Sequence, residues 1–254
     1  MRDIGLREAI RAAGSVSELA RRIGISQPSV STWDRIPAER VISVESATGV
    51  NRAILRPDLY SSGELDEIDV ARAQEYSLLA ALLSRAPDKA LLEKLATLRG
   101  DASPIGMAHI AIAEAAANAS VERVEREYFD LFIGLGRGEI LPYGSYYLTG
   151  FLHERPLARL REDLRTIGIE RTEGEVEPED HAAILCEIMA GLASKTLSAP
   201  AGSDRMIFEK HLVPWIGRFF TDLEQNDASK FYRPVGTLGR TFMEIETEAF
   251  ALPS

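Results

Sequence analysis

The chain has 254 residues, enough for one or two domains with hydrophobic cores. Hydrophobic residues make up 45% and charged residues 27% of it, a composition typical of globular proteins and not of disordered ones. No apolar run approaches the ~20 residues that cross a bilayer, and the opening "MRDIGLREAIRAAG" lacks the apolar stretch of a signal peptide. Because Cys186 is the sole cysteine, an internal disulfide is excluded, and we expect a cytoplasmic protein.

The net charge of −10 is unevenly distributed along the chain. Residues 1–60 hold nine Lys and Arg against seven Asp and Glu, a net charge of +2, so the remainder, with 20 against 32, carries −12. An acidic body repels nucleic acid and attracts basic peptides. The asymmetry predicts two parts with different partners, of which only residues 1–60 could approach DNA.

Residues 1–60 have the pattern of short helices joined by tight turns. In "SVSELARRIG", Ser15 or Ser17 can cap a helix, and Gly24 follows its end. In "ISQPSVSTW", Ser26 can cap the next helix, with Pro28 near its first turn, where a missing N–H costs little. A helix, a short turn with glycine and a second helix form the helix-turn-helix pattern.

The second of these helices would present small polar side chains that can reach base edges and phosphates. The expected DNA-facing residues are Gln27, Ser29, Ser31, Thr32 and Arg35. A net charge of +2 is low for a DNA-binding domain, so a protein-interaction module of three helices is the alternative. DNA binding would need a homodimer on two half-sites, because one small domain buries little surface.

The stretch from "SVSELARRIG" to "LRPDLY" resembles the Cro-like YdaS antitoxin family of small helix-turn-helix DNA-binding proteins. The resemblance rests on Trp33, the "PAER" run and the closing "LRPDLY", which occur in this order. It implies a helix-turn-helix domain over residues 1–60, with Gln27, Ser29, Ser31 and Thr32 facing DNA.

The polar, turn-rich residues 61–67 are predicted to be a linker. From residue 68 to residue 254, nearly every segment has the apolar spacing of a helix, and no alternation typical of a strand persists. The sequence therefore predicts an all-α body. In "MIFEKHLVPWIGRFFTDLE", the helix should be kinked at Pro214.

The run "EPEDHAAILCEIM" concentrates three carboxylates, a proline and a histidine before an apolar stretch. Glu177 is expected at the N-cap, with Pro178 at the first helical position. Glu179 and Asp180 would then lie in the first turn, where the helix dipole favours acids. His181 would begin the buried face of this helix, about 100° away from Asp180, which is a poor geometry for a catalytic pair.

No motif for metal binding or catalysis stands out in the sequence. The four histidines, His109, His153, His181 and His211, lack the spacings of metal ligands, and no nucleophile elbow or Walker loop is present. We therefore expect no cofactor, no metal and no enzyme activity. For His181 a buried hydrogen-bonding role is favoured, and metal ligation is the alternative.

Four motifs of the body resemble those of the TorD/DmsD redox-enzyme maturation chaperones, the TorD/NarJ superfamily. They are "YFDLFIG" with "LPYGSYY", "EPEDHAAIL", "HLVPWIGRFF" and "FYRPVGTLGRTF", in this order along the chain. The resemblance implies an all-helical chaperone that binds the twin-arginine signal peptide or N-terminus of a molybdenum-enzyme catalytic subunit until its cofactor is inserted. A formate dehydrogenase is one client that fits.

The resemblance also implies which residues bind the client peptide. They are Glu177, Pro178, Asp180 and His181, with walls formed by Tyr128, Leu131, Phe132, Pro142, Ser145, Tyr147, His211, Pro214 and Trp215. An aromatic groove edged by carboxylates complements a peptide with basic residues followed by an apolar segment. Core packing is the alternative for the aromatic residues. For the whole protein, the alternative is a transcription regulator whose helical body senses a ligand or a client.

Overall fold

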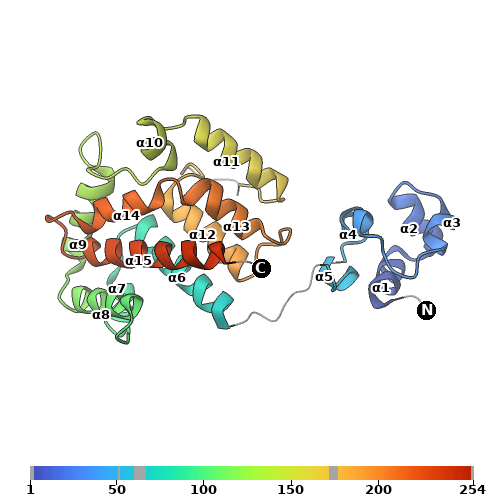
Figure 1. Ribbon diagram of the computed structural model, residues 1–254, viewed down its shortest axis with the longest axis horizontal. Coiled ribbons are helices and arrows are strands. Elements are labelled where there is room, and N and C mark those ends of the chain that lie inside the picture. The colour runs from blue at the N-terminus through green and yellow to red at the C-terminus, as the bar shows by residue number, and fades with distance from the viewer. Residues whose placement is uncertain (1–2, 51, 60–66, 172–176, 253–254) are drawn as a thin grey trace. The chain divides into compact units, whose positions relative to one another are not determined.

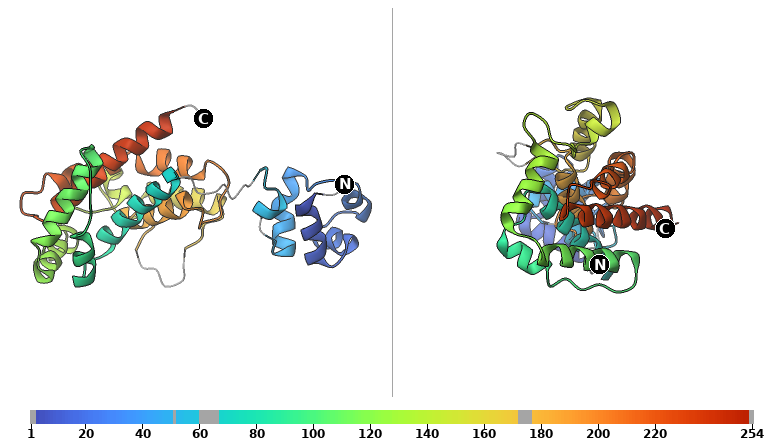
Figure 2. Two further views of the ribbon diagram at one scale, coloured as in Figure 1. Left: turned by 90° about the horizontal axis from the view of Figure 1, so that it is seen from below. Right: turned by 90° about the vertical axis from the view of Figure 1, so that its left-hand side faces the viewer.

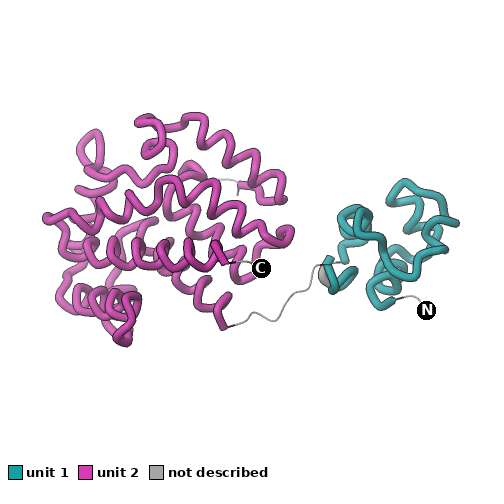
Figure 3. Tube along the Cα trace, in the orientation of Figure 1, with its two compact units in different colours: residues 1–66 teal, residues 67–254 magenta. Residues whose placement is uncertain are grey.

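The computed structural model describes residues 3–50, 52–59, 67–171 and 177–252. The chain divides into two compact units, Met1–Asp66 and Glu67–Ser254, each with its own hydrophobic core (Figure 3). The described residues form helices and no strand, so the predicted all-α fold class is confirmed. Among the described helices, none has the length and apolar content that a membrane span requires.

The smaller unit is a set of short helices around a compact core. The helices are α1 (Ile4–Ala13), α2 (Val16–Arg22), α3 (Gln27–Ser31), the 3₁₀ helix η1 (Ala38–Arg40), α4 (Val41–Thr48) and α5 (Arg52–Leu55). Side-chain oxygens of Asp3, Ser15 and Ser26 accept hydrogen bonds from backbone N–H groups at the starts of α1, α2 and α3. These caps satisfy donors that have no partner within their helices. The predicted caps of α2 and α3 are thus confirmed.

Helices α2 and α3 pack against each other in a helix-turn-helix arrangement. Leu19 and Ala20 of α2 and Val30 of α3 are buried in the core of this unit. Gly24, in the turn between the helices, has a φ of +70°, a left-handed conformation that glycine adopts without steric cost. The left-handed conformation of this turn therefore explains why a glycine occupies position 24.

The larger unit begins at Glu67, which is the first residue of α6 and not the last residue of a linker. Residues 61–66 of the predicted linker lie outside the described residues. The α-helices of this unit are labelled in Figure 1. They are α6 (Glu67–Ser84), α7 (Lys89–Leu95), α8 (Pro104–Ala117), α9 (Val121–Tyr128), α10 (Gly144–Thr149), α11 (Arg155–Thr166), α12 (Ala182–Ala193), α13 (Ser203–Ile207), α14 (Ile216–Glu224) and α15 (Tyr232–Ala251). Two π-helical segments, η2 (Phe129–Ile133) and η3 (Phe208–Leu212), continue α9 and α13.

The core of the larger unit is built around α12. This helix packs along α6, and α15 packs against α14 and α8 (Figure 1, Figure 2). All residues of α12 except Ile184 and Glu187 are buried, as expected of a helix that is apolar on every side. Cys186 lies in the middle of this helix, and burial raises the pKa of its thiol to about 12.

The contact between α14 and α15 depends on glycine. A Cβ atom placed on Gly236 of α15 would lie 2.3 Å from the backbone nitrogen of Glu224, at the end of α14. No side chain fits at this distance, so Gly236 allows the two helices to approach closely.

The helix predicted around Pro214 is interrupted rather than kinked. The segment η3 ends at Leu212, Trp215 has a non-helical backbone, and α14 starts at Ile216. A proline inside a helix has no N–H to donate, and its ring collides with the carbonyl group four residues before it. Since the chain turns here, Trp215 is buried while Pro214 stays exposed.

Candidate functional site

Two segments that are far apart in sequence meet at the start of α10. An antiparallel bridge pairs Tyr143 with His181. The N–H of Gly144 donates to the carbonyl oxygen of Asp180 at 2.9 Å, and the N–H of Ala182 donates to that of Pro142 at 2.8 Å. These bonds fix residues 142–145 against residues 180–182.

The bridge explains why α12 begins at Ala182 and not at Pro178, as the sequence predicts. The N-cap is His181, whose Nδ1 accepts a hydrogen bond from the N–H of Ala183 at 3.1 Å. Extending the helix toward Glu177 would break both backbone hydrogen bonds of the bridge. The carboxylates of Glu177 and Asp180 therefore lie before the helix and not in its first turn.

Asp180 is a buried carboxylate with one uncommitted oxygen. Asp180 is only 3% exposed, and its Oδ2 accepts a hydrogen bond from the N–H of Ser145 at 2.7 Å. Oδ1 of Asp180 and Oγ of Ser145 are both buried without a hydrogen-bond partner among the described residues. Because a buried polar atom without a partner costs free energy, this pair is suited to a ligand that donates hydrogen bonds.

Both residues line a pocket of about 230 Å³. Its lining consists of Tyr143, Ser145, Leu152, His153, Glu177, Pro178 and Asp180. The hydroxyl of Tyr143 donates to Oε2 of Glu177 at 2.7 Å. Burial, and then this hydrogen bond, raise the pKa of Tyr143, so its hydroxyl remains a donor at neutral pH. The pocket therefore combines two carboxylates with an apolar rim.

The carboxylate of Glu179 is directed to a different partner. Its Oε2 accepts a hydrogen bond from Nε of Arg161 in α11 at 2.8 Å. Partial burial opposes ionisation, but the hydrogen bond from Arg161, a backbone hydrogen bond and the charges of Arg161 and Arg171 together lower the pKa of Glu179. Glu179 thus anchors this segment to α11, whereas its neighbour Asp180 lines the pocket.

His181 supports the pocket from within the protein. Its ring meets that of Tyr143 edge-on, with centroids 5.0 Å apart. Burial lowers the pKa of His181, although Glu177 and Asp180 oppose the change. The imidazole is therefore neutral at pH 7, with Nδ1 as acceptor and the proton on Nε2. The hydrogen-bonding role predicted for His181 is confirmed. Within the described part of the chain, no three His, Cys, Asp or Glu side chains are grouped as metal ligands.

Trp215 packs against α10, the helix that contains Tyr147. A Cβ atom on Gly144 would be 3.0 Å from Nε1 of Trp215, so the indole packs directly against the first residue of α10. The Tyr147 ring lies 5.6 Å from the indole, and its hydroxyl donates to Asp222 at 2.7 Å. These aromatic rings fix the position of α10 and, through it, of Ser145.

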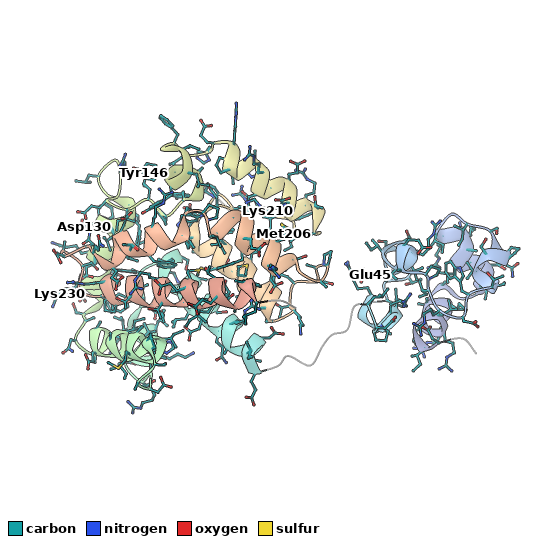
Figure 4. All side chains as sticks on the ribbon, viewed as in Figure 1. Glu45, Asp130, Tyr146, Met206, Lys210 and Lys230 are labelled. Carbon is teal, nitrogen blue, oxygen red and sulfur yellow. The ribbon has the colours of Figure 1, made fainter. Side chains whose placement is uncertain are left out.

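His211 and Pro214 do not reach the pocket lining. Nε2 of His211 lies 2.8 Å from Oδ2 of Asp163 in α11, and Nζ of Lys210, labelled in Figure 4, is 3.3 Å from the same carboxylate. The backbone carbonyl of His211 accepts the indole N–H of Trp215. His211 therefore connects η3 to α11 next to the site.

Two more of the predicted wall residues, Tyr128 and Phe132, belong to an aromatic cluster around Tyr232. Phe132 lies 5.3 Å from the ring of Tyr232 and 5.1 Å from that of Tyr128. The hydroxyl of Tyr128 donates to the carbonyl of Ser84 at 2.9 Å. Leu131 and Phe132 are buried, so core packing accounts for both.

Of the predicted client-binding residues, the structure thus brings Ser145, Glu177, Pro178 and Asp180 into one pocket, and Pro142 and His181 hold its backbone. Sequence reasoning missed Tyr143, Leu152 and His153. Tyr143 lies inside the "LPYGSYY" motif, where its position could have suggested it. Leu152 and His153 lie in a turn with no periodic pattern, so nothing in the sequence marked them.

The residues predicted to face DNA lie on or just beyond α3. Gln27, Ser29, Ser31 and Thr32 are all exposed, and the Gln27 amide donates to Oγ of Ser31 at 2.9 Å. The structure therefore exposes these four side chains on α3 and at the residue that directly follows it.

Arg35 differs from these four residues because its charge is compensated. Its guanidinium lies 3.1 Å from a carboxylate oxygen of Asp58 and 4.0 Å from one of Asp3. These ion pairs connect the segment after α3 to both ends of the unit. A phosphate contact by Arg35 would have to compete with them.

Comparison with known proteins gives matches for both units. Residues 98–221 match the family described as "Nitrate reductase delta subunit", and residues 6–64 match the family described as "Bacterial toxin YdaS". The chaperone protein TorD of Vibrio cholerae serotype O1 is 28% identical over 190 residues, which cover 71% of this chain and 82% of that protein. TorD of Shewanella loihica is 25% identical over 202 residues, covering 70% of this chain and 92% of that protein.

A solved structure described as a redox enzyme maturation protein, from Archaeoglobus fulgidus, aligns with a TM-score of 0.47 and 22% identity. The alignment covers 68% of this chain and 93% of that one. The family resemblances predicted from the motifs are confirmed by the sequence matches: the larger unit is TorD-like and the smaller unit is YdaS-like.

Proposed function

We propose that this chain, TorD-like over its larger unit, is a non-enzymatic chaperone that holds the N-terminal segment of a molybdenum-cofactor oxidoreductase subunit during maturation. The client segment would carry basic residues followed by an apolar stretch, as a twin-arginine signal peptide does. Formate dehydrogenase is the client that we would test first. The TorD proteins of similar sequence support the class of function.

The observation that carries this proposal is the uncommitted oxygen of Asp180. A buried carboxylate whose Oδ1 has no partner among the described residues is stabilised by a cation that donates a hydrogen bond. Glu177 adds a second carboxylate to the pocket, and residues 61–254 carry a net charge of −12, which attracts basic peptides over a longer range. Leu152 and Pro178 supply apolar surface for the neighbouring client residues.

The first experiment identifies the client. The tagged full-length protein is purified from its native cell, and the bound proteins are determined by mass spectrometry. We expect a molybdenum-enzyme catalytic subunit and, with synthetic peptides, binding of its N-terminus that weakens with salt. Failure of every molybdenum-enzyme subunit and leader peptide to bind would refute the proposal.

The second experiment tests the pocket with two neighbouring carboxylates. Asp180→Asn keeps the shape of the side chain and an acceptor for the N–H of Ser145 but removes the charge, so client affinity should fall by at least about tenfold. Glu179→Gln is the matched control, because Glu179 pairs with Arg161 and does not line the pocket. Equal client affinity in wild type and Asp180→Asn would show that the peptide binds elsewhere.

The smaller unit supports a second candidate function, transcription regulation. The specific observation is that Gln27, Ser29 and Ser31 of α3 and Thr32, which directly follows it, are all exposed, next to a tight helix-turn-helix turn. Selection from a random DNA library with the full-length protein should then enrich one sequence, and binding should weaken steeply with salt. Gln27→Ala should reduce this enrichment. Recovery of no sequence would favour a protein-interaction role for this unit.

A further inference from the structure

Residues 148–153, the last two residues of α10 and the turn that follows them, expose three large apolar side chains. Leu148 is 42%, Phe151 70% and Leu152 40% exposed. Residues 148–153 contain no Asp, Glu, Lys or Arg. A single exposed apolar side chain is ordinary, but three within five consecutive positions form a surface that suits an apolar partner.

The turn is held in its shape by its own hydrogen bonds. The hydroxyl of Thr149 donates to the carbonyl of Ser145 at 2.8 Å and accepts from the N–H of Phe151 at 3.2 Å. Gly150 has a φ of +83°, and its N–H donates to the carbonyl of Tyr146 at 2.7 Å. His153 has a φ of +60°, a conformation that residues with a Cβ rarely adopt. The exposed apolar side chains thus belong to a segment whose conformation is fixed by its own hydrogen bonds.

This surface adjoins the pocket that contains Asp180. Leu152 and His153 belong both to the turn and to the pocket lining. Ser145 and Asp180 line the same pocket, and Oγ of Ser145 and Oδ1 of Asp180 are buried without a partner among the described residues. A cationic side chain that donates to these oxygens would lie in the pocket that Leu152 lines, so the neighbouring residues of its chain would lie near the turn.

We propose, on the basis of the function proposed above, that residues 148–153 bind the first apolar side chain that follows the cation held in the pocket. The occupant is fixed by complementarity, since the carboxylates select the cation and the uncharged turn next to them selects an apolar neighbour. The two client side chains must share one face of the peptide. This face repeats every two residues in an extended segment and every three or four in a helix.

The test uses short synthetic peptides with one arginine and one leucine in a background of serine and alanine, with the leucine placed at successive distances after the arginine. Fluorescence anisotropy with the full-length protein should show an affinity maximum at one spacing, and this spacing reports the bound conformation. Replacing the leucine by serine in the best peptide should weaken binding about tenfold.

Phe151→Ser should cause the same loss with the leucine peptide and no further loss with the serine peptide, as a double-mutant cycle requires for a direct contact. Ile68→Ser is the matched control. Ile68 is 69% exposed, as Phe151 is 70% exposed, and lies in the first turn of α6, outside the pocket lining. Its substitution should leave all affinities unchanged, and both variants should keep the wild-type melting temperature.

The outcomes separate this inference from the proposed function. In one outcome, Asp180→Asn removes the dependence on arginine while Phe151→Ser leaves the affinity for both peptides unchanged. The turn is then not the apolar subsite, but the proposed binding of a cationic side chain in the pocket is supported. If the wild-type protein shows no arginine-dependent binding at all, both the proposed function of the pocket and the proposed role of the turn are wrong.

Discussion

Asp180 and His181 are sequence neighbours, and the structure gives them different tasks. Asp180, which lines the pocket, accepts the N–H of Ser145 with Oδ2, and its Oδ1 has no partner among the described residues. His181 points into the protein, pairs its backbone with Tyr143 and caps α12 with Nδ1. Substitutions at the two positions should therefore separate binding from stability.

The cap gives a direct prediction at His181. His181→Ala removes the acceptor for the N–H of Ala183 and should lower the free energy of unfolding by about 1 kcal/mol, measured by urea denaturation. His181→Asn should recover most of this loss, because asparagine is a good N-cap residue. An equal loss in both variants would mean that ring packing, and not the cap, stabilises this position.

Two histidines, the buried His181 and the partly buried His109, should make stability depend on pH in opposite directions. Burial lowers the pKa of His181 below its usual 6.5, while a hydrogen bond with Glu75, 2.8 Å away, raises the pKa of His109 above it. The stability contributed by neutral His181 is complete above pH 6.5 and is lost as the pH falls below it. The contribution of the His109 pair is complete below pH 6.5 and is lost as the pH rises through its raised pKa.

The measurement is the free energy of unfolding across pH values on both sides of 6.5. Relative to wild type, His181→Gln should reduce the decline of stability on the acidic side. His109→Gln should reduce the decline on the alkaline side. If both substitutions change the same side of the profile, the assignment of one of these shifts is wrong.

At the scale of elements, two glycines in the α14–α15 pair should respond in opposite ways to the same substitution. In Gly236→Ala, the new methyl group would lie 2.3 Å from the backbone of Glu224, so the helices must separate and stability should fall by about 1–3 kcal/mol. In Gly217→Ala, the methyl group meets no atom within 4 Å, and stability should rise by about 0.5–1 kcal/mol. Thermal unfolding of both variants tests the pair, and a rise for Gly236→Ala would contradict the close approach.

The helices themselves could be predicted because each one buries an apolar face, and this leaves a local pattern in the sequence. The caps Ser15 and Ser26 and the turn glycine Gly24 are local signals too, and they are confirmed. The start of α12 could not be predicted, because the preceding backbone is held by residues 142–144, far away in the sequence. Local preference for a helix at Pro178 loses to these non-local hydrogen bonds.

For the site, too, the sequence predicts individual residues but not the non-local contacts between them. The motifs identified Ser145 and Asp180, but their contact depends on a fold that brings α10 next to the loop before α12. Aromatic residues such as Phe132 and Trp215 carry the same sequence signal whether they line a groove or fill a core. The structure resolves this ambiguity by burying both.

At the scale of the whole molecule, the chain consists of two units with separate cores. The core of the smaller unit is formed by residues between Leu6 and Leu55, and that of the larger unit by residues between Tyr76 and Met243. No described residue belongs to both. Each unit therefore has the apolar contacts that an independently folding domain needs.

This arrangement predicts that residues 67–254 fold and bind the client without the smaller unit. The fragment should keep its helical circular dichroism and a cooperative thermal transition, and its client affinity should equal that of the full chain within about twofold. A fragment that folds but binds the client much more weakly would show that the smaller unit takes part in client recognition.

Because Cys186 is buried, the reaction of its thiol with a labelling reagent can report the opening of the core around α12. Thiolate is the form that reacts with maleimides and disulfide reagents, and a buried thiol with a pKa near 12 supplies almost none of it at neutral pH. Labelling must therefore wait until α12 separates from α6. The labelling rate in the native buffer then measures how often this core opens, without denaturant and without an engineered probe. A bound client that stabilises the larger unit should slow this reaction. Mass spectrometry of labelling over time would therefore report both how often the core opens and what fraction of the protein holds a client.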